Sequence, residues 1–451
     1  MSPAVGVPLT IEVPPSRLRE YGYAAELLFG ICLGRAVHVM AGEEGRYRIS
    51  GVDRTLLSGT TGRGNLRDQQ LRCALDVTRI DISQELIRQG LPATLPVLRE
   101  SAAATEGDLL LSAFYLGSGC WELDHGLLDQ HQRVRGKDSW LERHGFLSLP
   151  VIHAYAELIR YRIAEAGLEI PGHRRTYKRW VTCDVDQPRD ESCYSMKRMV
   201  RRIGRNAVTE RSLGAMHRTA TNYRRVQQQG WAVDPNNTFD YLMAVNERHS
   251  NAMTFFLICG GSHQRDGSYG IDEPWMRSLM KSIHERGHAL GLHGSFDSLR
   301  IPGQLRAERG ALSKALQDLG ITGPMPSRQH YLRWFPGPSV GVVEEAEISL
   351  DSTLGFHDAC GFRRGMCCAF PLFDLERWQV SGVVEQPLVV MECAELGAEF
   401  SIPRDPAAVL DHFVSLARQC RAYSGTFTFL WHNSFLHQAV HKRMYETLAS
   451  V

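Results

Sequence analysis

A buried strand is expected where the chain reads Arg179-Trp180-Val181-Thr182-Cys183-Asp184-Val185-Asp186, because an apolar run there ends in two carboxylates. A second apolar run, Ala289-Leu290-Gly291-Leu292-His293, ends in an imidazole. Carboxylates and an imidazole at the C-terminal ends of neighbouring parallel strands can converge on one divalent cation, and α/β barrels place their chemistry at that edge. Taken alone, the two runs fit acidic loop caps and a backbone-bonded histidine equally well.

Strands and helices alternate through the rest of the C-terminal half. Residues 254–258 read as another buried strand, and an amphipathic helix then runs from Glu273 and stops at Gly287, before the His293 strand. Strands alternating with helices of about 12 residues indicate a parallel βα architecture. Further elements are expected at 307–319, 327–334, 350–356, 383–391 and 426–433.

Five motifs of this half follow one another in the order seen in a known enzyme family. They are Asp184-Val185-Asp186, the Thr-Phe-Phe run at 254–256, the strand with His293, the segment led by Arg328, and the last strand with His432. Residues 176–451 therefore resemble the polysaccharide deacetylases, the carbohydrate esterase family 4 or NodB-homology group. The resemblance implies an α/β fold, a distorted (β/α)7 barrel. It also implies removal of an N-acetyl group from an acetamido sugar or glycoconjugate with one divalent metal ion, zinc first, with Mn, Co, Ni or Fe as alternatives.

Residues 1–170 are expected to form a separate, smaller α/β or α+β domain. This boundary is expected because the Pro171-Gly172 break is followed by a basic segment that precedes the Asp184 strand. Residues 112–116 and 138–147 resemble, more loosely, the N-terminal extension of one bacterial branch of these proteins. The resemblance assigns no chemistry to that extension.

The resemblance implies Asp186 and His293 as metal ligands, but the third ligand departs from the family pattern. The family supplies a second imidazole four residues after the first, and this chain has Asp297 there. Asp297 could ligate through a carboxylate oxygen, or His330 could take the vacant place. Replacement of an imidazole in kind favours His330, although a histidine bonded to the backbone is a third interpretation of that residue.

The catalytic roles also follow from the resemblance. A metal ion would activate a water molecule, Asp184 would accept its proton, and Arg328 would hold Asp184 ionised. The backbone N–H of Tyr331 would donate to the oxyanion, and His432 would protonate the leaving amine. Candidate substrate contacts are Arg363, Glu392 and Trp431, although an ordinary loop charge is an equally good interpretation of Arg363 and Glu392.

Two other patterns have competing interpretations. Residues 197–225 contain nine Lys or Arg against one acid, which fits a solvated helix face or a rim that attracts an anionic substrate. His284-Glu285-Arg286-Gly287-His288 matches the zinc-peptidase pattern, which needs both histidines on one continuous helix. Because Gly287 ends the expected helix before His288, a zinc-peptidase site is not predicted.

Composition fits a soluble enzyme. The 451 residues are 43% hydrophobic and 22% charged with a net charge of +1, which gives no global attraction to nucleic acid or membrane. No signal peptide and no apolar window of membrane-spanning length is apparent. The 11 cysteines are odd in number and scattered, so reduced thiols and a cytoplasmic location are expected.

Three functional hypotheses remain open. The first is a metal-dependent carbohydrate N-deacetylase acting on an N-acetylated sugar. The second is a hydrolase of another small amide or imide on the same barrel. The third is a non-catalytic carbohydrate- or nucleic-acid-binding relative, although such a module needs none of the proton-transfer groups. The sequence leaves the sugar and the oligomeric state undefined.

Overall fold

The protein is described by a computed structural model covering residues 9–51, 54–61, 64–100, 107–168, 170, 175–210, 212–397 and 405–451. The chain forms two compact units that interleave along the sequence. The first unit contains Met1–Lys178, Leu332–Pro403 and Ser415–Phe427. The second contains Arg179–Tyr331, Arg404–Val414 and Thr428–Val451.

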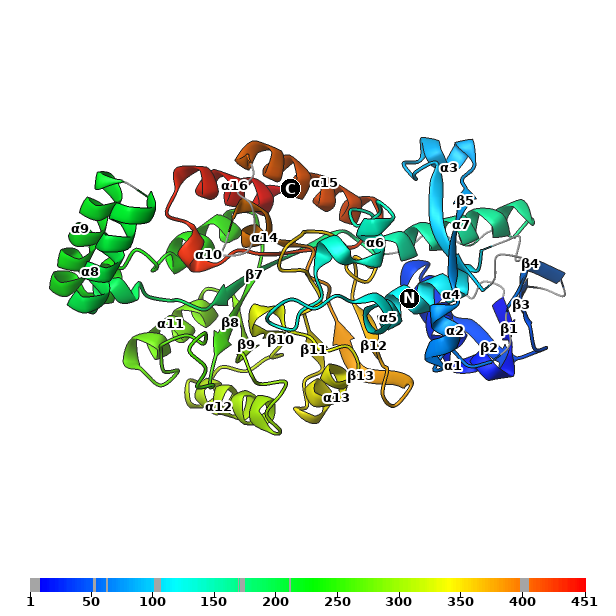
Figure 1. The fold of residues 1–451 in the computed structure, drawn as a ribbon, viewed down its shortest axis with the longest axis horizontal. Helices are drawn as coiled ribbons and strands as arrows, with labels where there is room; N and C mark the ends of the chain where they lie inside the picture. The colour runs from blue at the N-terminus through cyan, green and yellow to red at the C-terminus, as the bar shows by residue number, and fades with distance from the viewer. Residues whose placement is uncertain are drawn as a thin grey trace. The chain divides into compact units, whose positions relative to one another are not determined.

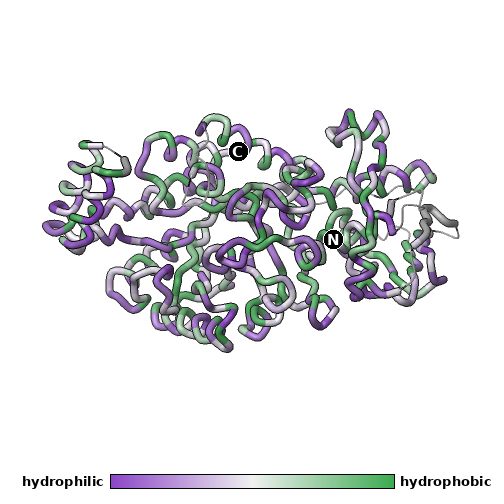
Figure 2. Tube along the Cα trace, in the orientation of Figure 1, coloured by the Kyte–Doolittle hydropathy of each residue, from purple (hydrophilic) through white to green (hydrophobic). Residues whose placement is uncertain are grey.

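A mostly parallel sheet organises the second unit (Figure 1). β7 pairs in parallel with β8, β8 with β9, and β9 with β10, which confirms the predicted parallel βα architecture. All six residues of β8 are buried, and Figure 2 colours most of this strand hydrophobic, as expected for a central parallel strand covered on both faces. The strand order is β10 (Ser327–Gln329), β9 (Ala289–Gly294), β8 (Met253–Ile258), β7 (Lys178–Val185) and β15 (Thr426–Leu430).

Helices connect the strands of this unit. α11 (Pro274–Glu285) joins β8 to β9, and α12 (Gln304–Asp318) joins β9 to β10. α11 begins with a proline in its first turn and is followed by Gly287, whose positive φ of 79° ends the helix. The other helices of the unit are α8 (Met196–Arg205), η5 (Asn206–Glu210), α9 (Leu213–Gln229), α10 (Phe239–Arg248) and α16 (Ala439–Ser450), with short turns η4 (Glu191–Cys193), η6 (Gly230–Val233), η7 (His330–Leu332) and η8 (Asn433–Phe435).

The end of α11 also bears on the zinc-peptidase pattern. Since the helix ends at Glu285, His284 and His288 do not lie on one helical face. His288 is instead buried, and its Nδ1 accepts a hydrogen bond from the backbone N–H of Met253 at 3.1 Å. The predicted end of the helix before His288 is therefore confirmed.

The first unit combines small sheets with helices. One four-stranded sheet has the order β2-β1-β3-β4, and β5 pairs with β6. β11 pairs in parallel with β13, whereas β12 and β13 form an antiparallel pair that the alternating pattern did not predict. Its strands are β1 (Leu9–Val13), β2 (Val37–Ala41), β3 (Arg46–Gly51), β4 (Arg54–Thr60), β5 (Asp76–Asp81), β6 (Thr94–Arg99), β11 (Leu350–Asp351), β12 (Phe370–Asp374), β13 (Gln379–Glu385) and β14 (Val390–Met391).

The helices of this unit are mostly short. The longest within its N-terminal segment, α7 (Val151–Glu165), buries nine of its 15 residues. α15 (Pro406–Ala422) is shared between the two units, because residues 404–414 belong to the second and 415–427 to the first. The remaining helices are η1 (Pro15–Arg17), α1 (Leu18–Ala25), η2 (Glu26–Cys32), α2 (Gln69–Cys73), α3 (Gln84–Arg88), α4 (Leu109–Ser118), α5 (Cys120–His125), η3 (Gly136–Asp138), α6 (Trp140–Arg143), α13 (Pro338–Glu345) and α14 (Glu392–Leu396).

Buried polar contacts explain why residues 332–403 belong with the N-terminal segment rather than with the rest of the predicted 176–451 domain. Arg363 forms a bidentate pair with Glu122, with both distances 2.9 Å. The Trp378 indole donates to Glu20 at 3.0 Å. The first compact unit therefore includes residues on both sides of the predicted domain boundary. The Pro171-Gly172 break proposed for that boundary lies outside the described residues.

No membrane-crossing helix and no disulfide occurs in the part of the chain that the structure describes. The search for helices long and apolar enough to cross a membrane finds none among these residues. All 11 cysteines of the sequence are free thiols, and most of them are buried.

Candidate functional site

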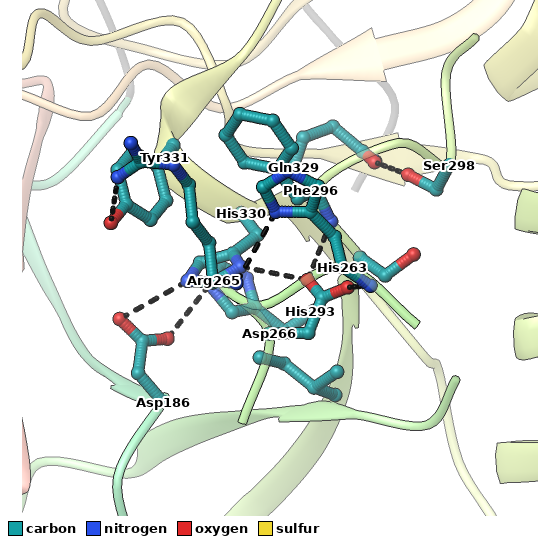
Figure 3. A network of polar contacts seen from close by, with 12 residues as sticks. Asp186, His263, Arg265, Asp266, His293, Phe296, Ser298, Gln329, His330 and Tyr331 are labelled. Carbon is teal, nitrogen blue, oxygen red and sulfur yellow. Dashed lines mark hydrogen bonds and ion pairs between the residues drawn. The ribbon is translucent and has the colours of Figure 1, made fainter. Parts of the chain in front are cut away.

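Asp186, His293 and His330 converge at the C-terminal edge of the second unit's sheet (Figure 3). Asp186 follows β7, His293 lies near the end of β9, and His330 follows β10. One side-chain atom from each of the three lies within 4.8 Å of the others. The His293 Nε2 is 3.2 Å from Asp186 Oδ1, and the His330 Nε2 is 3.5 Å from Asp186 Oδ2.

Hydrogen bonds at the far nitrogen orient both imidazoles. His293 Nδ1 lies 2.9 Å from the backbone carbonyl oxygen of Arg328, and His330 Nδ1 lies 3.2 Å from Asp266 Oδ1. Because both partners are acceptors, each Nδ1 carries the proton that it donates. A neutral ring then presents an Nε2 lone pair toward Asp186, which is the arrangement found in metal-binding histidines.

Electrostatics at this cluster couple Asp186 to the two histidines. Burial raises the pKa of Asp186, but His330 and His293 outweigh it and hold that pKa well below its usual range. Burial lowers the pKa of His330, and the Asp186 and Asp266 carboxylates outweigh it and raise the pKa to about 9. In the metal-free protein, the protonated imidazole of His330 therefore supplies a positive charge beside Asp186.

The cluster fits a divalent ion by its donor set. Two imidazoles and one carboxylate are common ligands of zinc at sites that leave a coordination position open. Asp186 Oδ1 is a buried oxygen that accepts no hydrogen bond from any described residue. A buried carboxylate oxygen without a donor is costly, and a cation would supply the missing partner.

Asp266 was not predicted from the sequence. It lies in the loop after β8, where Oδ1 accepts from the backbone N–H of Phe296 at 2.7 Å and Oδ2 accepts from that of His263 at 3.2 Å. Burial raises its pKa, and the contact with His330 and these backbone hydrogen bonds bring it below the usual value. The only local signal was an acid in a polar turn next to Gly267, which is typical of many loops.

Asp184 lies two residues before Asp186, near the end of β7, and is buried. Arg328 Nη1 donates to Asp184 Oδ1 at 2.9 Å and to the Thr182 hydroxyl at 2.8 Å. The guanidinium of Arg328 also lies over the Phe256 ring, 4.6 Å from its centroid. The structure thus brings Asp184 and Arg328 together as an ion pair, with Asp184 Oδ2 3.6 Å from His293 Nε2.

His432 reaches the same cluster from β15. Its Nε2 lies 3.6 Å from Asp186 Oδ2, and its side chain is 15% exposed, compared with 1% for His293. A partly exposed imidazole can exchange protons with solvent more readily than a fully buried one. β15 and β7 are neighbours in the sheet, which is why His432 and Asp186 approach each other despite their distance in sequence.

Tyr331 has a backbone conformation that is unusual for its residue type. Its φ is 63° and its ψ 12°, in the left-handed region that side chains other than glycine rarely adopt. Its hydroxyl accepts a hydrogen bond from Arg265 at 3.2 Å, and the Arg265 guanidinium lies over the ring. Residues in this region often mark functional sites, where the surrounding contacts hold the strained backbone.

Four other predicted residues are not among the converging metal ligands Asp186, His293 and His330. Asp297 lines a separate cavity of about 280 Å³ with His263 and Gln304, and it is not among the converging metal ligands. The Trp431 ring is buried and packs against Tyr445. Arg363, paired with Glu122, and Glu392, buried at the start of α14, belong to the first unit.

A cavity of about 760 Å³ opens beside the cluster. Asp186, His330 and Tyr331 lie in its wall, together with residues of α8 and of the loop that carries Asp266. Its volume is within the usual range of small-molecule sites. A sugar-sized ligand therefore has room next to the candidate metal ligands.

Comparisons with known proteins give little beyond this geometry. Residues 9–167 match the model of a family described as "Family of unknown function (DUF7033)". No curated protein matches the chain. One similar solved structure is described as a "putative polysaccharide deacetylase from Mycobacterium smegmatis"; it is 15% identical, the match covers 61% of this chain and 83% of that one, and the TM-score is 0.38. A likeness of that size assigns no function to this chain.

Proposed function

We propose that the protein is a metal-dependent hydrolase that removes the N-acetyl group from an acetamido sugar or glycoconjugate, on a distorted (β/α)7 barrel. The observation that carries the proposal is the convergence of Asp186, His293 and His330 beside the buried Asp184–Arg328 pair. These residues combine a metal-ligand set with a carboxylate positioned to accept a proton. Zinc is the first candidate for the ion, because two imidazoles and a carboxylate suit it well.

The residues divide into ligands and proton carriers. A divalent ion held by Asp186, His293 and His330 would polarise the acyl carbonyl and acidify water. Asp184 accepts the proton of the attacking water, since the charge-assisted hydrogen bond from Arg328 orients its carboxylate. Amide hydrolysis requires one group that accepts a proton from the attacking water and another that donates a proton to the leaving amine.

Departure of the amine needs a proton donor on the other side of Asp186. His432, 3.6 Å from Asp186 Oδ2, delivers that proton to the leaving nitrogen. The backbone N–H of Tyr331 donates to the carbonyl oxygen as its negative charge grows. The left-handed backbone of Tyr331 is the local feature that supports this role.

Metal analysis and acetate release together test the proposal. Purified protein is expected to bind about one zinc per chain. His330→Ala should lose the metal, whereas Asp297→Ala, the matched change at the other candidate third ligand, should retain it. Acetate should be released from at least one member of a panel of N-acetylated sugars.

Each failure points to a different alternative. A chain that binds no divalent metal would contradict the enzyme hypothesis and support a non-catalytic carbohydrate-binding role. A metal-binding chain that releases no acetate from any sugar, but hydrolyses a small amide or imide, would replace the sugar substrate with the second hypothesis.

We also propose that the protein works in the cytoplasm. All 11 cysteines are free, and reduced thiols persist in reducing compartments. Fractionation of the native host's cells, with antibody detection, should find the chain with cytoplasmic markers. Recovery with exported proteins would contradict this location.

A further inference from the structure

The cavity beside Asp186 has an unusually basic wall. Arginines outnumber carboxylates among its lining residues, and most of the arginines come from α8. The chain as a whole has a net charge of only +1, so this basic wall is a local feature and not the result of a generally basic chain. The arginines are Arg189, Arg198, Arg201, Arg202, Arg205 and Arg265, and the carboxylates are Asp186, Asp190, Glu191 and Asp266.

Two of the α8 arginines are already paired with acids. Arg198 Nη1 donates to Glu191 at 2.5 Å, and Arg202 Nη1 donates to Asp190 at 3.0 Å. These pairs join α8 to the turn η4 and its N-cap residue Asp190, which follow β7. Arg198 and Arg202 therefore already have carboxylate partners within the wall.

Three arginines of the wall have no carboxylate partner. Arg201 and Arg205, both exposed, make no hydrogen bond or ion pair with any residue of the described segments. The Arg265 guanidinium donates to the Tyr331 hydroxyl and lies over the rings of Tyr331 and Phe296. The unpaired arginines of α8 line the same cavity as Asp186 and His330. This position favours a binding role for them over a helix face that only carries solvated charge.

We propose that Arg201, Arg205 and Arg265 bind an anionic group, phosphate or carboxylate, on the acylated amino sugar. Guanidinium groups bind both kinds of oxyanion through paired, charge-assisted hydrogen bonds. Since Arg265 neighbours Tyr331 and the other two project from α8, the anion lies at one side of the cavity and leaves the acyl group near Asp186. The assignment rests on the proposed function and narrows its substrate class to acidic amino sugars.

Binding measured by calorimetry on the zinc-loaded full chain is the first test. N-acetylglucosamine 1-phosphate supplies a phosphate, N-acetylmuramic acid a carboxylate, and N-acetylglucosamine is the neutral comparison. At least one acidic sugar should bind more tightly than the neutral one, and which acid it is identifies the anion. Binding should weaken as salt is added, because the partly exposed charges are screened.

Arginine variants separate the cavity from general surface charge. Arg201→Ala with Arg205→Ala should raise the Kd for the preferred acidic sugar about 10- to 100-fold, the size expected for lost charge-assisted hydrogen bonds. Zinc content should not change. Arg224→Ala with Arg225→Ala removes the same charge from exposed positions of α9 that do not line the cavity, and should leave the Kd unaltered.

Acetate release from the same three sugars distinguishes the two proposals. Tight binding of an acidic sugar that falls in the Arg201/Arg205 variant, without acetate release from any sugar, would keep the anion site and refute the deacetylase. Acetate release that is equal for neutral and acidic sugars and unchanged in that variant would keep the deacetylase and refute the anion site. No preference for an acidic sugar in the binding experiment would also refute the anion site.

Discussion

At the scale of the residue, the candidate metal site depends on what holds its ligands as much as on the ligands. His293 is oriented by a backbone carbonyl, which substitution cannot remove, whereas His330 is oriented by the Asp266 side chain. Such outer partners fix the ring and its tautomer. Asp266 is therefore a positioning residue whose contribution can be measured.

Asp266→Asn should weaken zinc binding about 10- to 100-fold, as removal of carboxylate partners of metal-bound histidines does. Asp266→Glu, which keeps the charge, should recover part of the affinity. Competition with a chelator measures both. Asp272→Asn, an exposed acid after the same strand, is the control and should bind zinc like the wild type. Equal affinity of all four proteins would show that Asp266 does not position His330.

Asp184→Asn and His432→Ala should each reduce kcat by about 10²- to 10⁴-fold, the usual contribution of one general acid or base. Zinc content should stay near the wild-type value, because neither residue belongs to the three ligands. Steady-state acetate release and metal analysis on the same preparations give both quantities. Near-full turnover of either variant would remove that residue from the mechanism.

The proton on His330 gives the metal-free protein a pH dependence. The pKa of His330 is raised to about 9 from an ordinary 6.5, so its stabilising contribution is complete below about pH 6.5 and is lost as pH rises through about 9. The Tm of chelator-treated protein should fall across that interval. His330→Gln should flatten the fall, and a wild-type Tm that rises between pH 6.5 and 9 would contradict the charged pair with Asp186.

Sequence patterns could identify Asp184, Asp186 and His293 as candidates because each lies near or just after the end of a recognisable apolar strand. Arg328 lies inside the short polar strand Ser327–Gln329, and only the family resemblance pointed to it. Asp266 could not be found in this way. Its role comes from a loop that folds back until its carboxylate meets His330, and spacing along the chain carries no record of that contact.

At the scale of the element, close packing between strands and side chains sets the geometry of the site. A Cβ at Gly291 in β9 would lie 2.7 Å from the Phe256 ring and 2.7 Å from the backbone oxygen of Pro326. The Phe256 ring supports the Arg328 guanidinium, which in turn holds Asp184. Gly291 thus permits the packing on which the ion pair rests.

Gly291→Ala should destabilise the protein by about 1–3 kcal/mol, the usual cost of overpacking a buried site. Catalysis should also fall, since displacement of Phe256 moves Arg328. Gly310→Ala in α12, where an added Cβ meets nothing within 4 Å, is the matched control and should not lower the Tm. A Gly291→Ala protein as stable and active as the wild type would show that β9 tolerates the extra atom.

Strand prediction succeeded where apolar runs are uninterrupted and failed where they are not. Residues 254–258 form most of β8 as expected, and residues 426–430 of the expected 426–433 element form β15. Residues 383–391 were expected to form one strand, but Pro387 divides them into β13 and β14, because proline lacks the N–H that a sheet needs. Of the element expected at 350–356, only Leu350–Asp351 is a strand.

At the scale of the whole molecule, the first unit is held together by contacts between distant parts of the sequence. The Arg363–Glu122 pair is almost fully buried, with side-chain exposures of 1% and 0%. Arg364 also approaches Glu122, at 3.3 Å. Loss of a partner in such a pair leaves a buried charge uncompensated.

Arg363→Ala should lower the free energy of unfolding by about 3–5 kcal/mol. Arg377→Ala removes a partly exposed pair with Glu344 in the same unit and should cost less than about 1 kcal/mol. Urea denaturation of both proteins measures the difference. Similar values for the two variants would show that Arg364 alone satisfies Glu122.

The interleaving of the two units affects how the chain can be made. The first unit is interrupted after Lys178 and is completed only by Leu332–Pro403 and Ser415–Phe427. During translation, its N-terminal segment therefore leaves the ribosome long before the segments on which it packs are synthesised. At about 5–20 residues per second, synthesis of the intervening chain takes on the order of ten seconds to a minute. During that time, the apolar surface that later packs on residues 332–397 stays accessible to chaperones. A chain truncated before residue 427 lacks part of both units, so neither unit can fold completely.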